Sequence, residues 1–126
     1  MQIDWLSNKA SSLSSGFPEK MVLLDCETTG GNALRHRIIE IGAILVDQGK
    51  IVRSWQSFCN PEQHLPESIQ RLTGISPAML ENAPTFSDIS HELSDLIEGR
   101  IFVAHNARFD FSFLKNELER EEIRFN

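Results

Sequence analysis

Two acidic residues separated by a single position stand out near the start of the chain, in the stretch VLLDCETTGG (22–31). The apolar run MVLLD (21–25) has the length and composition of a strand buried on both faces, and Asp25 and Glu27 come at its end. Residues i and i+2 of a strand point to the same side and lie about 6–7 Å apart. Two ionised carboxylates so placed repel each other by roughly 2–3 kcal/mol at an effective dielectric constant near 20, which favours a cation between them. The alternative is a pair of solvated acids just beyond a strand.

A third carboxylate, Asp110, lies in the first turns of a predicted helix that follows another apolar strand, IFVAH (101–105). If the two strands are neighbours, all three acids meet at the same edge of the sheet. Several hard oxygen ligands suit Mg²⁺ or Mn²⁺, and the chain contains no His/Cys set with zinc spacing.

The composition narrows the class of protein. The chain has 126 residues, 40% of them hydrophobic, which is enough for one packed domain. Its net charge of −6 argues against a protein that coats long stretches of nucleic acid. There is no apolar stretch of bilayer length, no secretory signal and no disulfide framework, so we expect a cytoplasmic protein without a membrane partner. The Ser-rich residues 1–19 are predicted to be a leader or linker, and residues 20–126 the folded domain.

The remaining patterns predict an α/β fold with a mixed sheet. Residues 37–61 read as two strands joined by a turn at Gln48-Gly49-Lys50. Four helices are predicted, of which the first is short and ends at Gly74 and the second has Ser76 as its N-cap. The third has a Thr85/Asp88 capping box and an apolar face of Phe86, Ile89, Leu93, Leu96 and Ile97. The fourth covers 107–123, with Asn106 as its N-cap and an apolar stripe of Phe111, Leu114 and Leu118.

DCETTG (25–30) and HNARFD (105–110) resemble the first and second motifs of the DnaQ-like, DEDD-type 3′→5′ exonucleases. That family includes the proofreading epsilon subunit of bacterial DNA polymerase III. IIEIGAILV (38–46) and LTGIS (72–76) also resemble the family, in the expected order. The resemblance covers residues 20–126 and implies an RNase H-like fold, with hydrolysis of terminal phosphodiester bonds by two divalent metal ions and release of nucleoside monophosphates.

The resemblance also implies roles for individual residues. Asp25, Glu27 and Asp110 would be catalytic metal ligands, and Thr28 would offer its backbone to the terminal nucleotide. Leu72, Thr73 and Phe109 would line the pocket for its base and sugar, and His105 and Asn106 would shape the loop behind the metal site.

The chain departs from the family pattern after Asp110. The family has a third motif there, a His or Tyr followed by a fourth Asp, together with a last strand and helix, and none of these follows in residues 111–126. His64 and His91 lie on a predicted loop and a polar helix face, so neither is expected to replace the missing base. We therefore expect the 126 residues alone to bind metal weakly and to have little or no nuclease activity.

The partners implied are nucleic acid 3′ ends, DNA before RNA, and a polymerase or a fused helicase or nuclease domain. Two other functions remain open: an RNA or oligonucleotide exonuclease of the same family, and an inactive module that binds nucleic acid or protein. Among other residues, Cys26 is predicted to be a buried thiol and ELEREEIRF (117–125) a solvated helix face. Glu40 is either a partner near the metal site or a strand-edge or helix-cap contact.

Overall fold

A mixed sheet with flanking helices organises the chain, as predicted, and the sheet has four strands within the described residues. The structure is a computed structural model that describes residues 19–125. The strands have the order β3-β2-β1-β4, with β1, β2 and β3 antiparallel and β4 parallel to β1. The elements are β1 (Lys20–Thr28), β2 (Ile38–Asp47), β3 (Lys50–Phe58), α2 (Glu67–Thr73), α3 (Pro77–Glu81), α4 (Phe86–Ile97), β4 (Ile101–Val103) and α5 (Ala107–Arg120).

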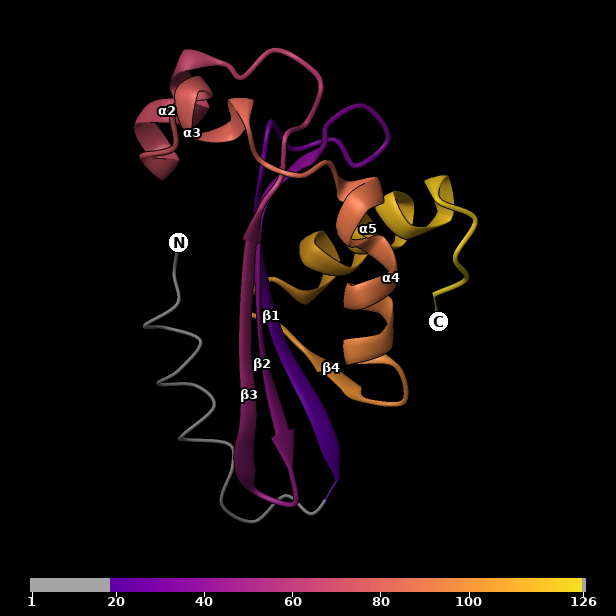
Figure 1. The fold of residues 1–126 in the computed structure, drawn as a ribbon. Coiled ribbons are helices and arrows are strands. Elements are labelled where there is room, and N and C mark those ends of the chain that lie inside the picture. The colour runs from indigo at the N-terminus through magenta and orange to yellow at the C-terminus, as the bar shows by residue number, and fades with distance from the viewer. Residues whose placement is uncertain (1–18, 126) are drawn as a thin grey trace.

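The helices divide into two groups in space. Figure 1 shows α4 and α5 against one face of the sheet, and α2 and α3 beyond the end towards which β1 runs. The larger core lies between the sheet and α4 and α5, with Val22, Leu24 and Cys26 of β1 contributing to it. Met21 and Leu23 belong to a second apolar cluster because alternate residues of a strand point to opposite faces.

The central strand β1 is longer than the sequence predicts. It continues through Asp25 and Glu27 to Thr28, because β2 pairs with it along its whole length. The two acids therefore lie within the strand instead of following it, and the i, i+2 geometry on which their shared direction depends is present. The register irregularity between Glu27 and Thr28 marks where regular pairing ends.

The predicted turn between β2 and β3 is confirmed. Gln48 and Gly49 have φ values of 49° and 80°, the positive-φ pair that joins two strands of a tight hairpin. The Thr85/Asp88 capping box of α4 is also confirmed, since each residue's side chain accepts a hydrogen bond from the other's backbone N–H. Gly74 has the left-handed conformation predicted for the end of α2.

The last helix, α5, differs from the prediction in three ways. It ends at Arg120, short of residue 123, and the Asn106 side chain makes no capping hydrogen bond. Phe113 takes the fully buried position, while Phe111 is half-buried against Phe102 and Phe125 at the helix flank. Strand β4 is likewise shorter than predicted, at three residues.

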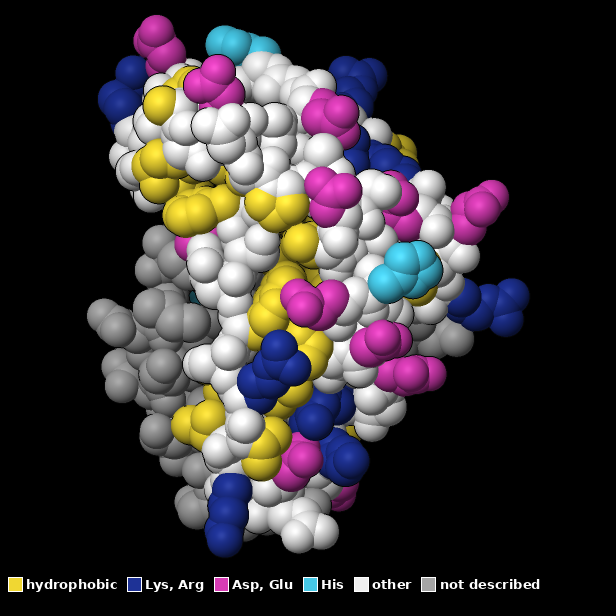
Figure 2. Space-filling model, viewed as in Figure 1, with side chains coloured by type: hydrophobic (Ala, Val, Ile, Leu, Met, Phe, Trp, Pro, Cys, Tyr) yellow, Lys and Arg dark blue, Asp and Glu magenta, His cyan; other side chains and the backbone are white. Residues whose placement is uncertain are grey.

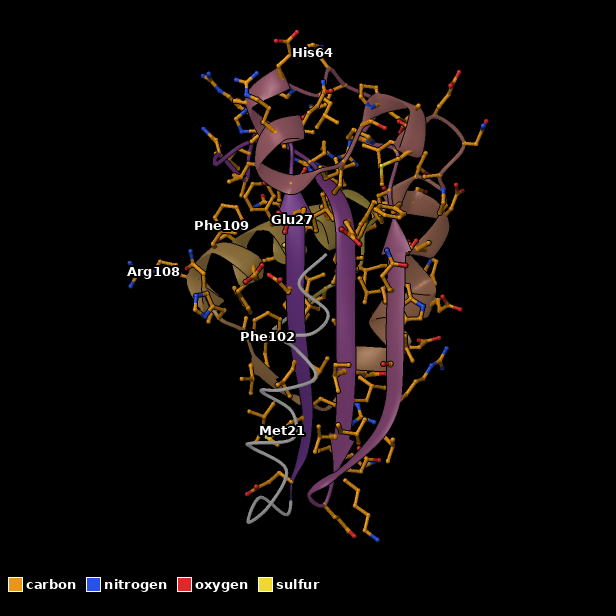
Figure 3. The ribbon with its side chains drawn as sticks, turned by 90° about the vertical axis from the view of Figure 1, so that its left-hand side faces the viewer. Met21, Glu27, His64, Phe102, Arg108 and Phe109 are labelled. Atoms are coloured by element: carbon orange, nitrogen blue, oxygen red, sulfur yellow. The ribbon has the colours of Figure 1, made fainter. Side chains whose placement is uncertain are left out.

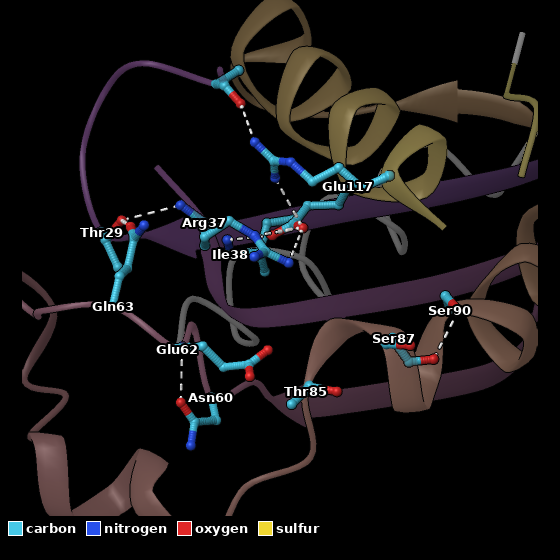
Figure 4. Close-up of polar contacts among 12 residues, drawn as sticks. Thr29, Arg37, Ile38, Asn60, Glu62, Gln63, Thr85, Ser87, Ser90 and Glu117 are labelled. Atoms are coloured by element: carbon cyan, nitrogen blue, oxygen red, sulfur yellow. Dashed lines mark hydrogen bonds and ion pairs between the residues drawn. The ribbon is translucent and has the colours of Figure 1, made fainter. Parts of the chain in front are cut away.

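Glu117 is a buried acid on α5, so the prediction that this stretch is a solvated face is wrong for this residue. Its side chain is 1% exposed and accepts hydrogen bonds from the Arg37 Nε at 2.8 Å and from the Ile38 backbone N–H at 2.9 Å. Arg120 adds a third contact at 3.1 Å and also donates to the carbonyls of Ala33 and Leu34 (Figure 4). The network ties α5 to the loop between β1 and β2.

Among the described residues, no helix is long and apolar enough to cross a membrane. The predicted leader, residues 1–19, lies outside the described residues apart from Glu19.

Candidate active site

Three acids meet at the edge of β1 that continues beyond β4. β4 pairs in parallel with β1 from Met21 to Leu23, which places the start of α5 at this edge. Asp110 of α5 therefore contacts Cys26, the residue that separates Asp25 from Glu27 in the chain. The condition set in the sequence analysis, that these two strands are neighbours, is therefore met. Asp25 and Asp110 are buried, at 9% and 2% exposure, and Glu27 is half-buried.

Asp110 is held by the backbone and the side chain of one residue of β1. Its Oδ1 accepts hydrogen bonds from the Cys26 backbone N–H at 3.2 Å and from the Cys26 thiol at 3.0 Å. Burial raises the pKa of Asp110 to about 6, with Asp25 adding to the rise and the Cys26 thiol opposing it. Cys26 is the buried thiol that the sequence predicts, but its contact with a site residue was not foreseen.

Asp25 and Glu27 carry negative charge that little in the fold offsets. Burial raises the pKa of Asp25, and the Cys26 N–H and His105 oppose the rise. Burial and the charge of Asp25 raise the pKa of Glu27. The Asp25 Oδ2 is buried, and no hydrogen bond reaches it from residues 19–125.

Glu40 is a fourth acid close to the site. It lies opposite Glu27 in the β1–β2 register, is 2% exposed, and its Oε2 accepts a hydrogen bond from Gln56 Nε2 at 2.9 Å. Its charge raises the pKa of both Asp25 and Glu27. Of the two interpretations left open by the sequence, the structure supports a neighbour of the acid site.

The donor set suits a hard divalent cation. The oxygens are carboxylates, burial and neighbouring acids raise their pKa values, and one oxygen of Asp25 is buried without a hydrogen bond from residues 19–125. Within residues 19–125, however, no three His, Cys, Asp or Glu side chains are close enough together to enclose a metal ion. The acids are near enough to affect one another's pKa values, so they form an electronegative edge of the sheet.

A pocket of about 250 Å³ opens next to Glu27, which is the acid in its lining. Its lining includes Glu27, Thr28, Leu72, Thr73 and Phe109, so the structure brings all four predicted substrate-pocket residues to one metal-ligand candidate. Figure 3 shows Glu27 and Phe109 next to one another below α2 and α3, whereas His64 lies at the far end of that segment. His64 is therefore no part of this site.

The walls of the pocket are held by local hydrogen bonds. Thr28 Oγ1 donates to the Gly30 carbonyl at 2.6 Å, which stabilises the bend after β1. Thr73 Oγ1 donates to the Ile69 carbonyl at 2.7 Å and accepts from the Ile75 N–H, which fixes the end of α2. Leu72 is 80% exposed, so its side chain is an open apolar surface at the pocket rim.

The loop after β1 has a steric requirement that the sequence did not disclose. A Cβ atom added to Gly30 would lie 2.6 Å from the His36 ring. The glycine therefore permits the imidazole to pack on the loop, where His36 Nδ1 accepts from the Asn32 N–H.

His105 and Asn106 join β4 to α5 and are both exposed. His105 is close enough to Asp25 for its charge to lower the pKa of that acid.

A second hollow, of about 490 Å³, lies on the other side of Phe109 and shares Gly31 with the first; Arg108 and Asn106 are on its rim. Arg108 is exposed and its guanidinium has no ion-pair partner within residues 19–125. Arg108 was not predicted from the sequence to be a site residue.

The comparisons with known proteins agree with this geometry. The exonuclease family profile matches residues 22–123, which include all three acids and the whole sheet except the first two residues of β1. The chain belongs to the exonuclease family. The resemblance to DEDD-type 3′→5′ exonucleases is confirmed, and with it the prediction that this is an enzyme family.

Two bacterial relatives illustrate where exonuclease domains of this kind occur. The 3′-5′ exonuclease DinG of Bacillus subtilis is 38% identical over 103 residues, which are 81% of this chain and 11% of DinG. The PolC-type DNA polymerase III of the same organism is 42% identical over 96 residues, which are 76% of this chain and 7% of the polymerase. The chain thus spans about a tenth or less of the length of these relatives.

Solved structures show the same fold. Apo exonuclease I matches with a TM-score of 0.76 at 18% identity, over 86% of this chain and 26% of that protein. Escherichia coli exonuclease I in complex with a dT13 oligonucleotide matches equally well, over 84% and 25%. The predicted RNase H-like mixed sheet of an exonuclease domain is therefore confirmed, and the chain covers part of such a protein.

Proposed function

We propose that this exonuclease domain hydrolyses the terminal phosphodiester bond at the 3′ end of single-stranded or frayed DNA and releases nucleoside monophosphates with the help of Mg²⁺ or Mn²⁺. The observation that supports the proposal is that a pocket of about 250 Å³ lies next to the acidic edge of the sheet, where burial and like charge raise the pKa values of the acids. Acids alone would support only a metal site, whereas the pocket gives room for a nucleotide beside them.

Each group of residues would do one part of the reaction. Asp25, Glu27 and Asp110 would hold the cations, which when bound lower the pKa of the attacking water and stabilise charge on the attacking and leaving oxygens. Phe109, half-buried against Phe113 with ring centroids 4.7 Å apart, offers a braced aromatic surface on which a terminal base can stack. Leu72 would close the pocket from the opposite side, and Thr28 would contact the nucleotide through its backbone.

The choice of DNA rests on the relatives. Exonuclease I is a structural neighbour that binds dT13 and dA16 oligonucleotides, and the PolC-type relatives are DNA polymerases. A polymerase or a fused helicase or nuclease domain is accordingly the partner we propose. RNA digestion is the competing outcome, because a pocket that accepts a ribose 2′-OH would admit either substrate.

We further propose that residues 1–126 alone are a weak nuclease. The three acids would bind metal ions, but two residues of the family pattern have no counterpart in residues 111–126. They are the His or Tyr that would act on the attacking water, and the fourth Asp. Joining a strand–helix segment with a His-x4-Asp pattern to the C-terminus should raise hydrolysis of a 5′-labelled single-stranded oligonucleotide. Rapid Mg²⁺-dependent digestion by the 126-residue chain, lost in D25N, would contradict this proposal.

The metal claim is tested by Mn²⁺ titration of the chain followed by electron paramagnetic resonance. D25N and E27Q should each weaken Mn²⁺ binding by more than about tenfold, because ligand removal exceeds the effect of changing an outer partner. D95N is the matched control, since Asp95 is an exposed acid of α4 away from the site. Equal affinities in D25N, D95N and the unchanged chain would reject the proposed function.

A further inference from the structure

Cys26 is placed unusually for a buried cysteine. Its side chain is 6% exposed and belongs to the apolar core, yet its thiol and its backbone N–H both point to the same oxygen, Oδ1 of Asp110. The arrangement is made possible by the short β4. Because β4 pairs with β1 only as far as Leu23, the edge of β1 beyond that point is open to the start of α5.

We propose that Cys26 is a positioning residue: it holds the Asp110 carboxylate with Oδ1 against β1, so that the other oxygen is left for a divalent cation. This inference rests on the proposed function, because it assigns a role to a residue behind the metal site. Cys26 also contributes to the lining of the pocket of about 250 Å³, but its proposed effect on the cation is exerted through Asp110.

The physical argument concerns the freedom of the carboxylate. A terminal carboxylate torsion is broad, so burial alone does not select which oxygen faces the site. Two donors from one residue, at 3.0 and 3.2 Å, select the orientation and fix it to the central strand. Both Cys26 donors bind Oδ1, so Cys26 leaves the other oxygen of Asp110 to a ligand.

A thiol meets two demands that few side chains meet together. It packs as a small apolar group in the core between the sheet and α5, and it still supplies a weak S–H donor. Alanine would keep the core apolar but remove the donor, and valine would fill the space with methyl groups facing a carboxylate. Serine would retain a donor in the same direction.

Mn²⁺ affinity of the 126-residue chain separates positioning from packing. C26A and C26V should weaken Mn²⁺ binding by about tenfold, which is the lower limit of the typical effect of removing a residue that orients a metal ligand. C26S should bind Mn²⁺ nearly as tightly as the unchanged chain. The matched control is C59V, because Cys59 is the other cysteine, is fully buried and has no side-chain hydrogen bond within residues 19–125. Urea unfolding of each variant without metal shows how much each substitution disturbs the fold.

The outcomes distinguish this inference from the proposed function. If D25N weakens Mn²⁺ binding while folded C26A and C26V bind as the unchanged chain does, the positioning role is overturned and the metal site stands. If C59V weakens binding as much as C26V at equal stability, packing explains the effect and the role is again overturned. If D25N binds as the unchanged chain does, the proposed function fails first.

A spectroscopic measurement tests the contact without any metal. The chain has two cysteines, so C59A leaves a single S–H stretching band in the infrared spectrum. In the folded chain this band should lie at lower frequency than in the urea-unfolded chain, and adding D110A should move it back. A band that D110A leaves in place would show that the thiol does not donate to Asp110, and would overturn the inference even if D25N and C26A change the affinity.

Discussion

Asp110 shows how strongly its surroundings alter a single carboxyl group. It is nearly fully buried, it is close to the charge of Asp25, and its pKa rises from 3.8 to about 6. The pKa values of Asp25 and Glu27 rise as well, for the same reasons of burial and like charge. Without a cation, these acids therefore oppose folding at neutral pH, and a cation bound by them as proposed would offset that effect.

The raised pKa values predict how stability depends on pH. Because the folded Asp110 takes up its proton at higher pH than the unfolded one, its favourable contribution is full below about pH 4 and is lost as the pH rises through about 6. Asp25 and Glu27 contribute with the same sign. Urea unfolding in the presence of a chelator should therefore give a free energy of unfolding that decreases from this group of acids between about pH 4 and 7.

D110N isolates one member of that group. The variant cannot ionise at position 110, so its decrease in stability over the same pH range should be shallower than that of the unchanged chain. Added Mg²⁺ should stabilise the unchanged chain more at pH 7 than at pH 5, because the cation binds the ionised carboxylates. The same pH slope in D110N as in the unchanged chain would contradict the assignment.

The glycine of the loop after β1 gives a second prediction at this scale. G30A should displace the His36 ring or the loop, because the added Cβ would meet that ring at 2.6 Å. We expect nucleotide binding to the adjoining pocket to fall several-fold, since the hydrogen bond from Thr28 to the Gly30 carbonyl shapes its wall. G31A is the control, because a Cβ there meets no atom within 4 Å. Equal thymidine monophosphate affinities in the two variants would contradict the prediction.

At the scale of elements, α5 links the core to the site. Its buried face includes Phe113, Leu114 and Leu118, which pack in the main core, and Asp110, which reaches the edge of β1. Glu117 fastens the same helix to the start of β2 and the loop before it. The position of Asp110 thus depends on contacts made two turns further along the helix.

Glu117→Ala should be strongly destabilising. It would leave Arg37 and the Ile38 N–H without their buried acceptor, and breaking such a pair typically costs about 3–5 kcal/mol of unfolding free energy. Glu119→Ala, at an exposed position whose pairing with Lys115 spans 4.0 Å, should change stability by less than about 1 kcal/mol. Urea unfolding at pH 7 measures both, and equal losses would contradict a role for the buried network.

For the whole molecule, the distribution of charge limits how it can hold a nucleic acid. Acidic residues outnumber Lys and Arg by 18 to 12. Figure 2 shows basic side chains scattered among acidic ones on the face in view, with apolar side chains exposed over the α2–α3 segment. Binding through a few contacts at a 3′ end fits such a surface better than binding along a strand.

The salt dependence of single-stranded DNA binding should accordingly be shallow. Each phosphate neutralised contributes about 0.7 to the slope of log affinity against log salt for a single strand, so a few contacts predict a slope of magnitude below about 3. R108A should reduce the magnitude by roughly 0.7, because Arg108 is the cation on the hollow next to the pocket. R53A, on the outer strand β3, is the control; fluorescence anisotropy with Ca²⁺ in place of Mg²⁺ measures all three proteins.

A slope as steep as that of a protein lying along many phosphates would contradict the end-binding mode. If R108A has the same salt slope as the unchanged chain, Arg108 does not contact the DNA, and the proposal for the acid site is unaffected.

The sequence alone was sufficient for local features, because these depend on neighbouring residues. The Gln48-Gly49 turn, the Thr85/Asp88 capping box and the shared face of Asp25 and Glu27 follow from backbone preferences and strand periodicity. Whether the first and last strands are neighbours was left open by the sequence, and the structure pairs them in parallel.

The tertiary structure alone decided which polar groups lie inside. Glu117 looked like part of a solvated helix face, and only the approach of Arg37 from 80 residues away makes its burial tolerable. Cys26 was foreseen as a core thiol, but its contact with Asp110 requires α5 to meet β1 where β4 ends. Periodicity along one element can say which way a side chain points, whereas the partner it meets there depends on how distant elements pack.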